Sequence, residues 1–170
     1  MRVPTTCALH LLVALLAAAG QAATPAREAH GSSDVFVMPG VVLAWGVLRG
    51  ADEASTKVVI RIDADPGSYA FVSVAGVDPF TQARRVLLPP TPLRAGFDFA
   101  SPRSRFVDYP RTELRFYAAA SAVDEDAPAL IVYYLGAPDT TPEFPTQAQL
   151  QTYLAQRVAN ARGEPRGKSP

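Results

Sequence analysis

The stretch Thr56–Asp63 constrains the fold of this chain more than any other. Its apolar and charged residues fall on opposite sides of an extended chain: Val58, Ile60 and Ile62 against Lys57, Arg61 and Asp63. Side chains alternate across a β-strand, so this pattern predicts a strand with one face in a core and one in water. Val59 is the one apolar residue on the polar side.

Seven further segments have strand character and are separated by turn signals such as Pro39-Gly40 and Pro66-Gly67. They are Val35–Met38, Val41–Arg49, Tyr69–Val77, Gln82–Leu88, Leu93–Phe99, Arg111–Ala118 and Ala129–Leu135. We expect Thr56–Asp63 to be the middle strand of a meander, with Tyr69–Val77 as its third strand. Val41–Arg49 and Ala129–Leu135 are apolar at alternate and intervening positions, which predicts burial on both faces.

The hydrophobic period changes near the end of the chain. Leu150, Leu154 and Val158 recur at helical spacing together with Tyr153, and Thr146 precedes Gln149 by the three residues of a capping box. The pattern predicts one amphipathic helix over Gln147–Arg162. We expect its apolar stripe to cover an open edge or end of the sheets, although such a helix can also dock into the groove of another protein.

Strands followed by one helix predict a mostly β fold. We expect an antiparallel β-sandwich, immunoglobulin-like or jelly-roll-like, of about eight strands with one C-terminal α-helix; a barrel is the alternative. The sandwich and its closing helix (147–162) would form a single domain over residues 35–162, followed by a disordered tail over residues 163–170.

Residues 1–22 have the features of a secretory signal peptide: a basic start at Arg2, the apolar run Leu9–Ala19 and a small-residue exit. Gly20 and Ala22 predict cleavage after Ala22, with cleavage after Gly20 and an uncleaved anchor as alternatives. A flexible leader would follow over residues 23–34. We therefore expect a protein of the periplasm or the extracellular space.

The composition limits the classes of partner that the protein can be expected to bind. Removing 22 of 170 residues leaves 148, and removing Arg2 leaves 15 basic against 16 acidic residues. This balance disfavours a nucleic-acid partner or an anionic membrane surface for the mature form. The single cysteine, Cys7, lies in the predicted signal peptide. Core packing, not disulfides, must then hold the domain together.

Catalytic residue types are scarce outside the signal peptide. The histidine is His30, in the predicted leader, and the lysines are Lys57 and Lys168. Serine catalysis needs a positioned base, and a zinc site needs several nitrogen or sulfur ligands. We expect no enzyme activity, no metal and no cofactor, although a pair of carboxylates could still converge in a hydrolase site.

Two stretches resemble short motifs without completing them. Asp63–Gly67 lacks the ligands of a calcium loop, and Asp139-Thr140-Thr141 lacks the glycine of an aspartic protease. We interpret both as turns, and Asp124–Asp126 as a solvated acidic turn that could at most bind calcium weakly.

The strongest functional candidate is a set of arginines and one tyrosine in or beside the predicted loop Ser101–Pro110. Its members are Arg103, Arg105, Tyr109 and Arg111. Guanidinium groups can pair the carboxylate or sulfate group of a ligand or an acidic loop of a partner. Internal pairing with Asp98 and Asp108 is the structural alternative.

An aromatic face is the second candidate. Tyr69, Phe71 and Tyr117, together with Trp45, could stack on a glycan or fill a partner pocket. Core packing is the alternative for all four.

Taken together, these patterns predict an exported, non-enzymatic binding or accessory module that acts through end loops on a protein partner. A module that binds a glycan or a small anion, a small carboxylate-dependent hydrolase and an inhibitor of an exported enzyme are the alternatives. An inhibitor would present a single protruding loop.

Overall fold

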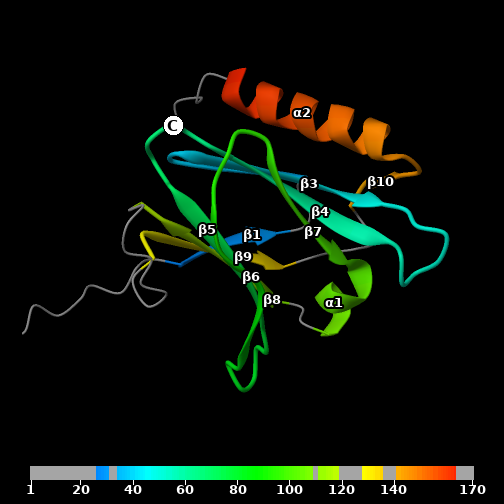
Figure 1. Cartoon of the computed structure of the whole chain (residues 1–170), viewed down its shortest axis with the longest axis horizontal. Helices are drawn as coiled ribbons and strands as arrows, with labels where there is room; N and C mark the ends of the chain where they lie inside the picture. The colour runs from blue at the N-terminus through cyan, green and yellow to red at the C-terminus, as the bar shows by residue number, and fades with distance from the viewer. Residues whose placement is uncertain (1–25, 31–33, 109–110, 119–127, 136–140, 164–170) are drawn as a thin grey trace, which may run out of the picture.

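The computed structural model describes residues 26–30, 34–108, 111–118, 128–135 and 141–163. Two β-sheets pack face to face, and a C-terminal helix, α2 (Gln147–Gly163), lies on the outer face of one of them (Figure 1). This architecture confirms the predicted sandwich with one closing helix, and α2 confirms the predicted helix to within one residue.

The sheet beneath α2, here called the helix sheet, has the order β10-β3-β4-β7, with β2 also paired to β3. Its strands are β2 (Val35–Met38), β3 (Val41–Leu48), β4 (Lys57–Ala64), β7 (Phe97–Pro102) and β10 (Glu143–Phe144). The other, here called the hairpin sheet, has the order β1-β9-β8-β5-β6. Its strands are β1 (Ala26–His30), β5 (Phe71–Val77), β6 (Arg84–Pro92), β8 (Arg111–Tyr117) and β9 (Leu130–Leu135).

The predicted meander is wrong in its third strand. β4 pairs antiparallel with β3 and β7, whereas β5 lies in the opposite sheet and pairs with β6 and β8. Two pairs, β1 with β9 and β10 with β3, are parallel. The alternation of apolar and polar residues predicts which face of a strand is buried but not which strand lies beside it. The passage of the chain from β4 in one sheet to β5 in the other therefore leaves no local signal in the sequence.

The main core lies between the sheets and contains the predicted inward face of β4: Val58, Ile60 and Ile62 are all buried. Trp45 meets Tyr134 edge to face, with ring centroids 5.0 Å apart. Burial raises the pKa of Tyr134 to about 12. These two rings are among the largest fully buried side chains of the described chain.

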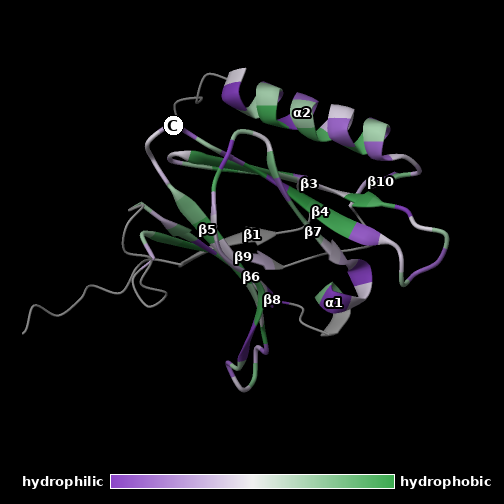
Figure 2. Cartoon of the chain, in the orientation of Figure 1, coloured by the Kyte–Doolittle hydropathy of each residue, from purple (hydrophilic) through white to green (hydrophobic). Residues whose placement is uncertain are grey.

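A second core lies between α2 and the outer face of the helix sheet. Leu150, Leu154 and Val158 pack against three residues of the sheet, Val42, Ala44 and Val59. In Figure 2, α2 lies along β3 and β4, and its outward side carries both hydrophilic residues and exposed alanines. The expectation that the helix covers an edge or an end is therefore wrong: it covers a face, and this explains why Val59 interrupts the polar side of β4.

The helix approaches β3 closely at Gly46. A Cβ atom on Gly46 would lie 2.7 Å from Cδ1 of Leu150 and 3.3 Å from the ring of Phe144. Thr146 Oγ1 accepts the backbone N–H of Gln149 at 3.3 Å, which is the predicted cap of α2.

Polar groups of the helix sheet that were expected in water are half-covered by α2. Arg61 donates two hydrogen bonds to Asp98, at 2.8 and 2.9 Å, and Gln151 of the helix donates to the same carboxylate at 2.7 Å. Further along the helix, Arg162 pairs with Asp63 and Asp65. These bonds tie α2 to three strands or turns of the sheet.

The strand expected over Leu93–Phe99 is displaced: β7 is Phe97–Pro102, and residues 93–96 precede it outside any strand. Two other boundaries differ from the sequence prediction because edge positions tolerate weak strand formers. Ala26–His30, expected in a mobile leader, forms β1 by pairing along β9. β6 was expected to stop at Leu88, yet it continues through Pro89, Pro90 and Pro92. Proline cannot donate to a neighbouring strand, and the free side of an edge strand does not require it to.

Several predictions fall outside the described residues. They concern the signal peptide with Cys7, the acidic turn 124–126, residues 139–140 and the tail from residue 164. Within the described residues, no helix has the length and apolar character needed to cross a membrane.

Leu154→Ala should lower the free energy of unfolding by about 2–5 kcal/mol, because it leaves a cavity in place of a side chain that has no exposed surface. Gln156→Ala, on the exposed side of the same helix, should change it by less than about 0.5 kcal/mol. Urea unfolding of the two variants measures both values. Equal effects would contradict the packing of α2 described above.

Candidate binding site

The predicted arginine loop is a helix for most of its length. Residues expected to be loop form α1 (Arg103–Asp108), directly after β7. Phe106 anchors it: this side chain is buried, and its ring meets Tyr134 edge to face at 5.7 Å. A helix this short has little stability of its own, so the packing of Phe106 into the end of the sandwich decides the conformation.

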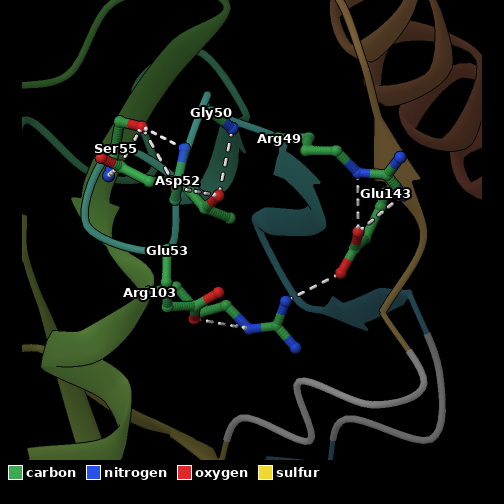
Figure 3. A network of polar contacts seen from close by, with 8 residues as sticks. Arg49, Gly50, Asp52, Glu53, Ser55, Arg103 and Glu143 are labelled. Atoms are coloured by element: carbon green, nitrogen blue, oxygen red, sulfur yellow. Dashed lines mark hydrogen bonds and ion pairs between the residues drawn. The ribbon is translucent and has the colours of Figure 1, made fainter.

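Arg103 belongs to an internal network at one end of the helix sheet (Figure 3). Its Nη1 donates to Glu143 Oε1 at 2.8 Å, and its Nε lies 3.6 Å from Glu53 Oε1. Arg49 donates to the other oxygen of Glu143, at 3.0 Å through Nη2. Internal pairing of Arg103, the structural alternative, is thus what the structure contains, and its described partners are Glu143 and Glu53.

The network ties together distant parts of the sequence. Glu143 lies in β10, Arg49 follows β3, and Glu53 lies in the turn before β4. That turn has its own hydrogen bonds, in which Asp52 Oδ1 accepts the backbone N–H of Ser55 at 2.8 Å. Its residues therefore hold the end of the sandwich together and are poorly suited to capturing a ligand.

Arg105 has different surroundings. It lines a slot of about 310 Å³ between the outermost strands of the two sheets, β6 and β7. Its side chain makes no ion pair or hydrogen bond with any residue that the structure describes. Among the predicted site residues that are described, Arg105 is the one with a free guanidinium group.

Arg111 lies on the outer face of the hairpin sheet. Its guanidinium carbon is 3.7 Å from the ring centroid of Tyr133 on β9, a cation–π contact. Beside it, Glu113 is 3% exposed. Its Oε1 pairs with Nε of Arg84 at 2.9 Å and with Nε of Arg115 at 2.5 Å. Burial and the Glu113 carboxylate both raise the pKa of Tyr133.

The four predicted site residues therefore do not form one cluster. Arg103 pairs with glutamate, Arg105 lines the slot and Arg111 contacts Tyr133, whereas Tyr109 lies outside the described residues. Sequence proximity placed them together, but α1 and the start of β8 turn successive side chains in different directions.

The predicted aromatic face is also divided. Tyr69 packs on Phe116 of the main core at 5.4 Å between centroids, and Tyr117 is buried with its hydroxyl 3.1 Å from Ser73 Oγ. Trp45 is a core residue and Phe71 is half-buried. Core packing, the alternative interpretation, describes Trp45 and Tyr69, and no open platform joins the four rings.

The sequence prediction missed the most exposed aromatic side chain of the described chain. Phe80 is 94% exposed at the tip of the β5–β6 hairpin, which projects from the body of the fold on the side away from α2 (Figure 1). A large apolar residue inside the turn sequence Asp78-Pro79-Phe80-Thr81 was the available signal.

Asp63–Gly67 forms the predicted turn. Ser68 N–H donates to the Asp65 carbonyl at 3.0 Å, and Gly67 has a φ of 81°. Within the described ranges, no group of three potential metal ligands lies together.

No protein-family model, curated protein or solved structure shows significant similarity to this chain.

Arg103→Ala should lower the free energy of unfolding by about 1–2 kcal/mol, because it removes a charged hydrogen bond to the partly exposed Glu143. Arg105→Ala should change it by less than about 0.5 kcal/mol. Thermal unfolding of both variants makes the comparison. A fall of the same size for Arg105→Ala would place Arg105 in the structural network.

The network should also give the fold a pH dependence. Hydrogen bonds from Arg49 and then Arg103 hold the pKa of Glu143 below its usual value of 4.5. The resulting stabilisation is present above pH 4.5 and is lost as the pH falls through the lower pKa of the folded state. Unfolding of Glu143→Gln, followed from pH 6 to pH 3, should show a weaker loss of stability than the wild type. Parallel curves would exclude this contribution.

Proposed function

We propose that this chain is an exported, non-catalytic binding module that recognises a protein partner by inserting Phe80 into an apolar pocket of that partner. The observation that carries the proposal is the 94% exposure of Phe80 on a loop that is closed by its own hydrogen bonds. Exposed aromatic side chains are costly in water and are enriched among the residues that dominate protein interfaces.

The loop that carries Phe80 is ordered by its own hydrogen bonds. Asp78 Oδ1 accepts the backbone N–H groups of Phe80 at 2.8 Å and Thr81 at 3.1 Å. These bonds, that to Thr81 first, hold the pKa of Asp78 below its usual value. Gln82 closes the loop, because its side-chain N–H donates to the Pro79 carbonyl at 2.8 Å. The backbone of Gln82 has a φ of 60°.

Rigidity supports the choice of a protein as the partner. A side chain that is already held in one place loses little conformational freedom on binding, which raises affinity for a pocket of fixed shape. Burying a phenylalanine side chain contributes roughly 1.5–3 kcal/mol. A lipid surface has no fixed shape and gains nothing from a loop ordered in this way, so we treat the membrane as the outcome that would replace the proposal.

The other function classes receive less support. Of the aromatic residues expected to stack on a glycan, Trp45 and Tyr117 are buried and Tyr69 packs on the main core. Most of the acidic side chains described above, among them Glu113, Glu143 and Asp98, are paired with arginine, which leaves them poorly placed for hydrolysis. An inhibitor of an exported enzyme remains compatible, since a single protruding loop is what that class predicts.

The test compares Phe80→Ala with Val37→Ala, a second exposed apolar residue (45% exposed) on a different sheet. The wild type and both variants are used to capture partners from cells that produce the protein, and the captured partner is then titrated. Phe80→Ala should raise its Kd by at least about 30-fold, the loss expected at an interface hot spot. Val37→Ala should leave it unchanged, and all three proteins should melt at the same temperature.

Equal capture by Phe80→Ala would refute the proposal. Binding of the wild type, but not of Phe80→Ala, to neutral phosphatidylcholine vesicles would show that the hairpin contacts a membrane instead. Asp78→Ala separates order from contact: it keeps the phenyl ring but frees the loop, and should weaken binding by about 2- to 10-fold.

A further inference from the structure

The slot between β6 and β7 has a chemistry that the hairpin proposal does not use. β6 ends one sheet and β7 ends the other, so the slot lies along the open side of the sandwich. Residues of β6 (Arg85, Val86 and Leu87), of β7 (Phe99 to Pro102) and Arg105 of α1 line it. Two of these side chains are cationic, and none is acidic.

Each arginine reaches the slot for a structural reason. Arg84 turns to the outer face of the hairpin sheet, where it pairs with Glu113, and strand alternation therefore sends Arg85 to the opposite side. Arg105 is carried by α1, which the buried Phe106 fixes against Tyr134. The two guanidinium groups thus come from elements that are held in place independently of any ligand.

A buried hydroxyl adds a third polar group. Ser101 is 6% exposed and stands opposite Val58 in the β4–β7 pair, so both side chains point between the sheets. Its hydroxyl makes no side-chain hydrogen bond with any other residue that the structure describes. It lines the slot, and because a hydroxyl group can rotate to suit its surroundings, it can donate to a ligand placed there.

The free side of β6 favours a compact ligand over an added strand. Pro89, Pro90 and Pro92 remove N–H groups from the second half of β6, which blocks the pairing of a long peptide along this edge. The half that lines the slot, Arg85 to Leu87, contains no proline. A volume of about 310 Å³ is close to the lower limit of small-molecule sites, about 300 Å³.

We infer that this slot is a carboxylate-binding site, in which Arg105 pairs the anionic group of a small acidic ligand or of an acidic side chain and Ser101 donates to it. Arg85, which also has a contact within the fold, adds positive charge beside them. Arginine forks match the two oxygens of a carboxylate, and such charged hydrogen bonds are about twice as strong as neutral ones. The inference does not depend on Phe80, and either proposal can fail while the other stands.

The test is a titration followed through the Nε–H signals of the arginines by NMR, at constant ionic strength maintained with chloride. The probes are acetate as the bare carboxylate, D-glucuronate as a free sugar acid, and a peptide that has blocked termini and one glutamate with a free side-chain carboxylate. The signals of Arg85 and Arg105 should shift saturably with at least one of the two larger probes. Tighter binding of glucuronate identifies a small-molecule ligand, and tighter binding of the peptide identifies a protein segment; both support the site.

Variants decide whether the slot is responsible. Arg105→Gln should weaken binding of the best probe at least about tenfold, and Ser101→Ala about threefold. Arg94→Gln is the matched control, because it makes the same change of charge at an exposed arginine outside the slot and should alter binding less than about twofold. Arg105→Lys keeps the charge without the fork and should bind less tightly than the wild type.

Three results would overturn the inference: no saturable shift with any probe, equal shifts with chloride alone, or an equal loss of binding in Arg94→Gln and Arg105→Gln. If Arg105→Gln lowers the melting temperature, Ser101→Ala and Arg105→Lys decide the question. Unchanged affinity in both would then exclude the slot.

Discussion

The fold depends on β3 being buried on both of its faces. One face contributes Leu43, Trp45 and Val47 to the core between the sheets, and the other contributes Val42 and Ala44 to the core beneath α2. A strand in this position cannot be solvated on either side, so the helix is a third layer of the fold and not an appendage. Gly46 sets the spacing, because its lack of a side chain lets Leu150 approach.

Arginine–carboxylate pairs surround these apolar layers and determine which charges are available for binding. Arg61, Arg103 and Arg162 each meet aspartate or glutamate from a segment far away in the sequence. Partly exposed pairs of this kind contribute modestly to stability, yet they fix the positions of turns and of the short strand β10. A side chain whose charge is already paired within the fold is poorly suited to recognising a partner. The candidates for recognition are therefore the groups outside these pairs.

Two such groups, Phe80 and Arg105, belong to parts of the fold that lie away from α2. The hairpin carries an apolar group on a loop ordered by Asp78, and the slot beside the base of the same hairpin carries cationic groups. Binding at the hairpin would depend on hydrophobic burial and binding at the slot on charged hydrogen bonds, so the two would respond differently to salt. Both use strand ends and edges, where the sandwich core makes no demand on the side chain.

By itself, the sequence determined the properties that repeat along the chain. Alternation in β4 predicted its buried face, and the helical spacing of Leu150, Leu154 and Val158 predicted α2, because each pattern records which side of a segment avoids water. Tertiary structure alone decided the rest: the crossing of β5 to the other sheet, the pairing of Arg103 with Glu143, and the separation of Arg103, Arg105 and Arg111. These depend on contacts between segments tens of residues apart, and no local period encodes such contacts.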